Sequence, residues 1–94
     1  MPYITKESRQ ELDNTLITLS NILKQSKAVE GDLNYSISFI LNEILLNECN
    51  YATLNKLVGS LECCKIELYR RIAAPYEDKK KAINGDVYSF SLYK

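Results

Sequence analysis

The chain opens with leucines that recur at the spacing of an amphipathic helix. Intervals of four, three and four residues place them on one face: Leu12, Leu16, Leu19 and Leu23. Ser8 precedes Glu11 by three residues, which is the pattern of a capping box, and Thr5 offers an N-cap one turn earlier. We predict a helix that begins near Ser8, or one turn earlier at Thr5, and ends at about residues 25–27, with its leucine stripe facing a core.

A second helix is predicted after Gly31 and Asp32, because glycine can take the positive φ of a chain break and aspartate is a preferred N-cap. Over residues 33–47, one apolar stripe consists of Leu33, Ile37, Ile40 and Ile44, with Leu41 at its edge. The opposite side carries Tyr35, Phe39 and Leu46. A helix with apolar side chains on two sides is covered on two sides. It is therefore either the central helix of the domain or a helix whose second side meets another subunit.

The third predicted helix is the longest. It follows N-caps at Asn50 or Thr53 and meets no proline before Pro75. Its core stripe comprises Leu54, Leu57, Val58, Leu61, Leu68 and Ile72. A second, mixed stripe comprises Tyr51, Asn55, Gly59, Glu62, Ile66, Tyr69 and Ala73. Glycine inside a helix costs about 1 kcal/mol against alanine. Gly59 therefore indicates a close approach, either by a crossing helix of the same chain, which we favour, or by a separate backbone or ligand.

Pro75 either kinks the third helix or begins a new one. We favour a break, followed by a short fourth helix over residues 75–83 that ends at Asn84 and Gly85. Beyond it the side chains alternate in the manner of a strand, with one side formed by Tyr88, Phe90 and Leu92. One strand alone is not stable. The tail is therefore an extended arm packed on the helices, an edge strand completed by another chain, or a disordered segment.

Together these elements predict one all-α domain over residues 1–94. Its architecture is a small bundle of three main helices with a short fourth helix and, over about residues 86–94, an extended C-terminal arm or short edge strand. A core of this size leaves only a few kcal/mol of net stability. We therefore expect a homo-oligomer.

The composition excludes several classes of function. Twelve Lys and Arg balance twelve Asp and Glu, which removes the broad electrostatic attraction to nucleic acids. The absence of His excludes Ser-His-Asp and Cys-His catalysis and leaves no imidazole for a zinc site. The longest apolar run, residues 37–46, is interrupted by polar residues and falls short of the ~20 residues that span a bilayer. We expect a cytoplasmic protein that does not bind membranes.

Cysteines and carboxylates offer little catalytic chemistry. The three cysteines are odd in number, and Cys63 and Cys64 project about 100° apart on a helix, so free thiols are expected. The sequence offers two candidate catalytic arrangements: Glu62 beside these cysteines, and the pair of Asp32 with Asp86. Paired carboxylates need a cleft that sequence separation cannot establish. We predict no enzyme, no catalytic residue, no metal site and no cofactor.

Tyrosines and basic residues suggest a binding surface. Seven tyrosines occur without tryptophan, and tyrosine is enriched where an apolar ring must end in a polar contact. The predicted binding residues are Tyr51, Asn55, Gly59, Glu62, Tyr69, Arg70, Arg71, Tyr76, Lys79 and Lys80. The alternative is a solvated face in which Glu67 pairs with the two arginines three and four residues later.

Several segments resemble a known family. They are MPYI, GDLNY, YATLN, ECCKIELYRR, APYEDKK and NGDVY, which together make up 36 of the 94 residues. They are similar to a family of short uncharacterised proteins, a domain of unknown function met in phages, prophages and their bacterial hosts. The resemblance implies an accessory protein of a phage or mobile element in the cytoplasm of a bacterial host, without assigned site residues.

The sequence is consistent with two functions. The first is a non-enzymatic, phage-type binding module that contacts its own copies or a host protein, for instance by inhibiting host defence. The alternative is a binder that sequesters a nucleotide signal between subunits, with Arg70, Arg71 and tyrosines contacting phosphate and base.

Overall fold

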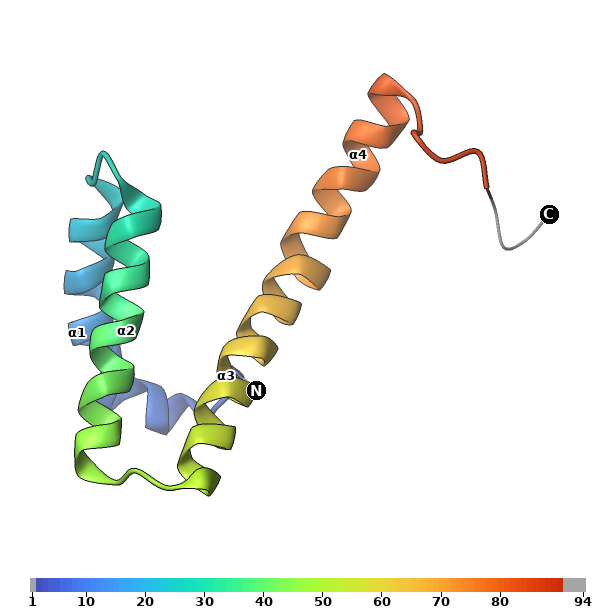
Figure 1. The fold of residues 1–94 in the computed structure, drawn as a ribbon. Helices are drawn as coiled ribbons and strands as arrows, with labels where there is room; N and C mark the ends of the chain where they lie inside the picture. The colour runs from blue at the N-terminus through green and yellow to red at the C-terminus, as the bar shows by residue number, and fades with distance from the viewer. Residues whose placement is uncertain (1, 91–94) are drawn as a thin grey trace. The chain divides into compact units, whose positions relative to one another are not determined.

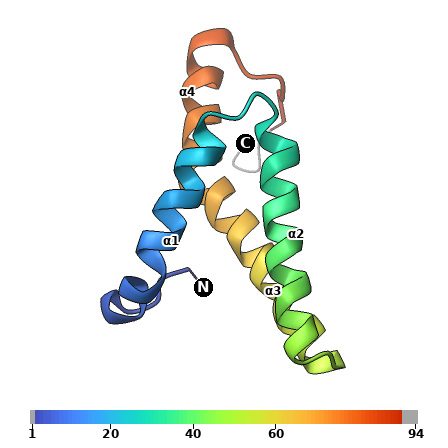
Figure 2. The same cartoon turned by 90° about the vertical axis from the view of Figure 1, so that its left-hand side faces the viewer.

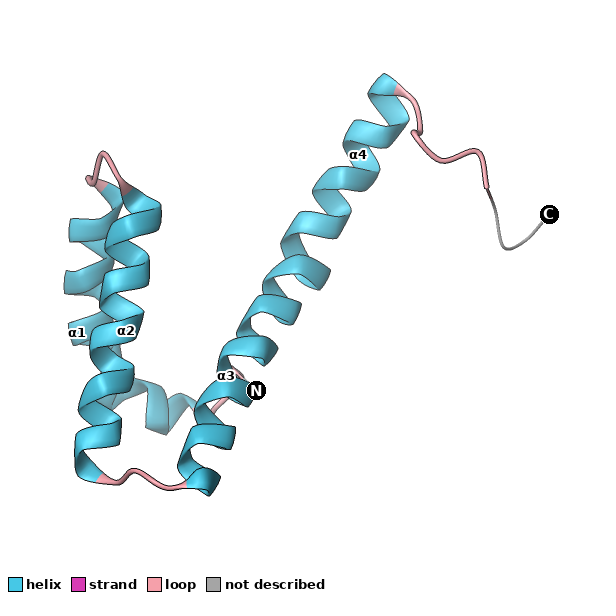
Figure 3. Ribbon diagram, in the orientation of Figure 1, coloured by secondary structure: helices cyan, strands magenta, loops and turns pink. Residues whose placement is uncertain are grey.

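The computed structural model describes residues 2–90, and every regular element in them is helical (Figures 1 and 3). The elements in chain order are α1 (Lys6–Lys24), α2 (Val29–Asn47), α3 (Tyr51–Leu68), the π-helical turn η1 (Tyr69–Ala73) and α4 (Ala74–Asn84). The predicted all-α fold with three main helices is confirmed. In the described part of the chain, no helix combines the length and the hydropathy that a membrane crossing requires.

The chain divides into two compact units, one with residues up to Ser60 and the other with residues from Leu61 onward. The boundary falls within α3, so the two units are joined by helical backbone. The expectation of a single domain remains a prediction.

In the first unit, α1 begins one turn before the predicted capping box. Thr5 is its N-cap: the Thr5 hydroxyl accepts a hydrogen bond from the Ser8 backbone N–H at 3.2 Å and donates one to the Ser8 hydroxyl at 3.0 Å. The earlier of the two predicted starts is therefore correct. The helix ends at Lys24 with Gln25 as C-cap, in agreement with the predicted end.

The predicted start of the second helix is wrong, because α2 already begins at Val29. Gly31 lies inside its first turn without a positive φ, and Asp32 is not the N-cap. The reason is Ser26, whose hydroxyl donates to the Asp32 carboxylate and accepts from the Ala28 backbone N–H at 3.0 Å. The Asp32 side chain thus fastens the turn between α1 and α2 from within the helix.

Helices α1 and α2 contact each other and lie closest near their connecting turn, from which they diverge (Figure 2). Half-buried residues occur on both helices: Leu19 and Leu23 on α1, and Ser36, Ile37, Leu41 and Leu45 on α2. The predicted stripe of α2 is only partly covered, since Leu33, Ile40 and Ile44 stay exposed. Among residues 2–90 no side chain is fully buried.

Helix α3 begins as predicted. The Asn50 side-chain oxygen accepts from the Thr53 backbone N–H at 2.8 Å, and the Asn50 carbonyl accepts from the Leu54 N–H at 3.0 Å. The Asn50 side chain therefore satisfies one of the backbone donors that the first turn leaves without helical partners, and the Asn50 carbonyl accepts the first hydrogen bond of the helix.

The predicted break at Pro75 is wrong, because α3, η1 and α4 follow one another without interruption. In place of a break, the backbone widens into the π turn, where the Ala74 N–H donates to the Tyr69 carbonyl five residues earlier. An α-helix would need a hydrogen bond from the N–H that proline lacks, and the proline ring would clash with the carbonyl four residues back. The π turn directly before Pro75 relieves this conflict.

Helix α4 ends as predicted. The Gly85 N–H donates to the Lys81 carbonyl at 2.9 Å, and Gly85 adopts a φ of 92° that favours glycine. Residues 86–90 form no strand, so the edge strand is not found in the described tail. The predicted strand positions at Leu92 and beyond lie outside the described residues.

Candidate interaction surface

Helix α2 presents an exposed aromatic face. Tyr35 is 68% exposed, Phe39 53% and Leu46 73%. The helical spacing brings the two rings together, with centroids 6.1 Å apart and planes inclined by 44°. We call these three residues the α2 aromatic face.

The two rings line a shallow hollow between α1 and α2, together with Leu19, Ser36 and Ile40. The Ser36 hydroxyl already donates to the Asp32 backbone carbonyl at 2.8 Å. The hollow therefore offers apolar contact area rather than reactive groups, which suits binding of an apolar side chain.

The charge of α2 has one sign. From Val29 to Asn47 the helix carries Glu30, Asp32 and Glu43 and no Lys or Arg. Asp32 is engaged by Ser26. Glu43 lies one turn after Phe39, so an exposed carboxylate flanks the α2 aromatic face. A partner that carries positive charge would therefore complement this face.

In the second unit, both predicted binding arginines have partners within the chain. Arg70 donates two hydrogen bonds to Glu67, at 3.1 and 3.2 Å, and the Glu67 side chain is only 15% exposed. The predicted pairing of Glu67 with Arg70 is confirmed. Arg71 is engaged as well. Arg70 therefore lies on the charge-paired face that was the predicted alternative.

Tyr69 bridges the π turn. Its hydroxyl donates to the Glu77 carboxylate at 3.1 Å, so the start of η1 is linked to the first turn of α4 across Pro75. This hydrogen bond and the negative charge of Glu77 raise the pKa of the Tyr69 phenol above its ordinary value of 10.0, with smaller contributions from desolvation and Asp78. At neutral pH the phenol is thus held as a donor.

Helix α4 carries an exposed apolar stripe between lysines. Tyr76 is 60% exposed and Ile83 75%, and a spacing of seven residues places them on one side of the helix. Lys79 and Lys80 lie on either side of this line, and the Lys80 ammonium is 5.8 Å from the centre of the Tyr76 ring. We call these four residues the α4 lysine-flanked stripe.

The predicted mixed stripe of the third helix is exposed except at Ala73, which is half-buried. Tyr51 is 78% exposed, and Asn55 and Gly59 are exposed beside it. A Cβ at Gly59 would meet no heavy atom within 4 Å, so the favoured crossing helix is not found within its own unit, residues 2–60. Glu62 pairs with Lys65 at 3.3 Å. Among the predicted binding residues, Lys80 and Tyr76 contact each other. Arg70 and Tyr69 instead contact Glu67 and Glu77, which were not predicted as binding residues.

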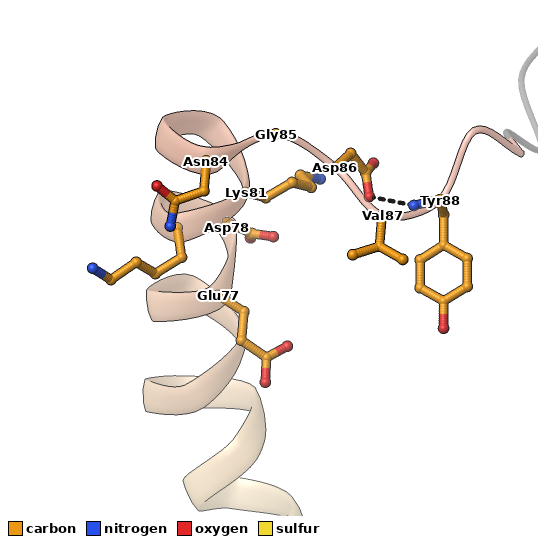
Figure 4. Close-up of a pocket in the computed structure, with 9 residues that line it drawn as sticks. Glu77, Asp78, Lys81, Asn84, Gly85, Asp86, Val87 and Tyr88 are labelled. Atoms are coloured by element: carbon orange, nitrogen blue, oxygen red, sulfur yellow. Dashed lines mark hydrogen bonds between the residues drawn. The ribbon is translucent and has the colours of Figure 1, made fainter.

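The candidate catalytic residue Asp86 forms a local hydrogen bond at the end of α4. A hollow beyond the end of α4 is lined by Glu77, Asp78, Lys81 and the turn after Gly85 (Figure 4). There the Asp86 carboxylate accepts a hydrogen bond from the Tyr88 backbone N–H at 2.9 Å.

The three cysteines are free thiols, as predicted. Within residues 2–90, no group of His, Cys, Asp and Glu is arranged to hold a metal ion.

Sequence reasoning placed Tyr35 and Phe39 on a second apolar side of α2 but left both out of the predicted binding residues. The available signal was an aromatic pair four residues apart on a helix that already had another apolar stripe.

The fold and this surface define a small all-helical protein whose exposed apolar faces are its main chemical feature. The chain belongs to the family described as a domain of unknown function (DUF6899), whose model matches residues 1–87. No curated protein and no solved structure matches the chain.

Proposed function

We propose that this protein is a non-enzymatic interaction module that binds another polypeptide through the α2 aromatic face. The observation that carries the proposal is the exposure of Tyr35, Phe39 and Leu46, by 53 to 73%, on a helix that also contacts α1. Exposed apolar residues are ordinary one by one, but a contiguous set is typical of protein interfaces. Aromatic residues are also enriched at interface cores.

A non-catalytic role is supported by the interactions of the three carboxylates that the sequence offers as candidate catalysts. Asp32 accepts a hydrogen bond from Ser26 in the turn before α2, and Glu62 forms an ion pair with Lys65. Asp86 accepts a hydrogen bond from the Tyr88 backbone N–H in the tail. Each of these groups has a local structural partner.

The setting we propose is the cytoplasm of a bacterial host, where a phage-type accessory protein would bind a host protein, such as a defence component, or its own copies. The similarity of the quoted sequence segments supports this setting. Nucleotide binding is the second candidate and ranks below protein binding, because a phosphate at Arg70 would have to displace Glu67 from a two-bond contact.

The test compares proteins retained from a bacterial lysate by the tagged wild-type chain and by two variants. Phe39→Asp places a charge in the α2 aromatic face. Val87→Asp makes the same change at a position that is 91% exposed in the tail and serves as the matched control. We expect Phe39→Asp to lose the retained proteins, its own untagged copies included, while Val87→Asp keeps them. Equal retention by all three chains would refute the proposed function.

A further inference from the structure

The α2 aromatic face and the α4 lysine-flanked stripe are complementary in chemistry. Each presents exposed apolar side chains along one side of a helix. The first is flanked by the Glu43 carboxylate on a helix without any basic residue, and the second by the ammonium groups of Lys79 and Lys80. Opposite charges at the rim of an apolar contact favour the correct partner and speed its association.

Pairing α2 with the α2 of another copy would lack this complementarity. Glu30 and Asp32 lie near one end of the helix and Glu43 near the other, so antiparallel pairing brings acids of the two copies together. Like charges at an interface suppress association. A symmetric α2 contact is therefore disfavoured, and the acidic face is better matched by a basic helix.

The exposed apolar area of the α2 aromatic face and the α4 lysine-flanked stripe is close to the area that a standard dimer interface buries. Five side chains contribute, and their exposed fractions are 68, 53, 73, 60 and 75% for Tyr35, Phe39, Leu46, Tyr76 and Ile83. With about 200 Å² for each side chain, they offer about 650 Å² per chain. A standard interface buries roughly 800 Å² per partner. The flanking charged side chains can supply the remainder.

We propose that the partner of the α2 aromatic face is a second copy of this chain, which covers it with the α4 lysine-flanked stripe. The contact is reciprocal: α2 of each copy receives α4 of the other, as in a two-fold symmetric dimer. This inference rests on the proposed function and names the partner for the same face.

The test is a charge exchange between two variants of the full-length chain. Glu43→Lys reverses the charge beside the α2 aromatic face, and Lys79→Glu reverses the charge beside the α4 stripe. In a reciprocal dimer of either variant, both contacts join like charges. In a dimer that combines one copy of each variant, one contact is wild type and the other has its two charges exchanged, so both are attractive.

The readout is the dimer dissociation constant from sedimentation equilibrium at low salt, with circular dichroism to verify helical content. We expect each variant alone to raise this constant about tenfold, because the altered contact occurs twice in each dimer. An equimolar mixture should return to within about threefold of wild type. Glu7→Lys and Lys56→Glu change the charge by the same amounts away from both stripes and should leave the constant unchanged.

Three results would overturn the inference: a wild-type chain that is monomeric at high micromolar concentration, a dimer that neither reversal weakens, or a mixture that is no stronger than its components. If a reversal disturbs the helical content, Glu43→Gln and Lys79→Gln replace it, with a smaller expected weakening and the same controls. A monomeric chain that still captures another protein through Phe39 would refute the second copy alone. Loss of any dependence on Phe39 would refute the proposed function itself.

Discussion

Gly59→Ala is predicted to stabilise the protein. Gly59 lies within α3 on an exposed surface, its φ is not positive, and a Cβ at this position would meet no heavy atom within 4 Å. Alanine is favoured over glycine inside a helix by about 0.8–1.0 kcal/mol, largely because glycine loses more backbone freedom on folding. Since no contact opposes the added methyl group, the full propensity difference should appear.

For a chain of this size, about 1 kcal/mol raises the melting temperature by roughly 4–8 °C. The assay is thermal unfolding followed by far-ultraviolet circular dichroism, with wild type and variant at the same protein concentration because association adds apparent stability. Gly85→Ala is the matched control and should lower the melting temperature, because alanine is strained at the φ of 92° that Gly85 adopts.

A lower melting temperature for Gly59→Ala would refute this reasoning. It would mean that a backbone or side chain approaches Gly59 in solution, as the amino-acid sequence first suggested. If the melting temperature fell only at concentrations where the protein associates, the approaching group would belong to a second copy.

Three further predictions concern the helix caps, the π turn and ligands. Thr5→Ala should lower the free energy of unfolding by about 1 kcal/mol, measured by urea denaturation, because it removes the acceptor for the Ser8 N–H; an unchanged midpoint would contradict the cap. Because the pKa of Tyr69 is raised in the folded state, its stabilising hydrogen bond should be present below pH 10.0 and be lost as the pH rises through the folded-state value. Ultraviolet titration should show one tyrosine that ionises late and disappears in Tyr69→Phe, and a titration identical in both proteins would contradict the link to Glu77. Nucleotides should leave the melting temperature unchanged in both wild type and Arg70→Ala, whereas a ligand at one hundred times its Kd would add about 2.7 kcal/mol.

Local rules predicted much of this fold from the amino-acid sequence. Asn50 and Gly85 occupy the predicted ends of helices, because each satisfies backbone groups within a few residues of itself. Such interactions depend on neighbouring residues alone, so spacing suffices to find them. Thr5 was found for the same reason, although the choice between it and Ser8 needed the geometry of both hydroxyl groups.

The errors arose where a side chain had two available roles. Asp32 is a good N-cap by type, yet its carboxylate accepts a hydrogen bond from the Ser26 hydroxyl in the preceding turn, and α2 begins four residues earlier. Pro75 normally ends a helix, yet the π turn before it removes the need for the missing N–H. In both cases the outcome depends on hydrogen bonds that span the expected boundary, and residue type alone does not specify them.

The candidate site was predictable only in part, since apolar periodicity shows that a side chain needs cover but not what covers it. The half-buried residues Ile37 and Leu41 and the exposed Tyr35 and Phe39 belong to the same helix and are similar in apolar character. What separates them is the position of α1, which contacts one side of α2 and diverges from it (Figure 2). The sequence identified both sides, and the helix pairing determined which one is available.

The link between association and folding follows from the exposure of these side chains. Hydrophobic residues make up 46% of the chain, and full burial of a large apolar side chain contributes about 1.5–3 kcal/mol. The caps and helical hydrogen bonds can form the individual helices locally, but helices of about 20 residues gain most of their stability from packing of an apolar side. With no described side chain fully buried, much of that contribution is still available in the single chain. A partner that covers the α2 aromatic face would therefore stabilise the helix that binds it. For this reason, substitutions on that face should weaken folding and binding together, whereas a charge reversal at its rim, which leaves the apolar side chains in place, can separate the two effects.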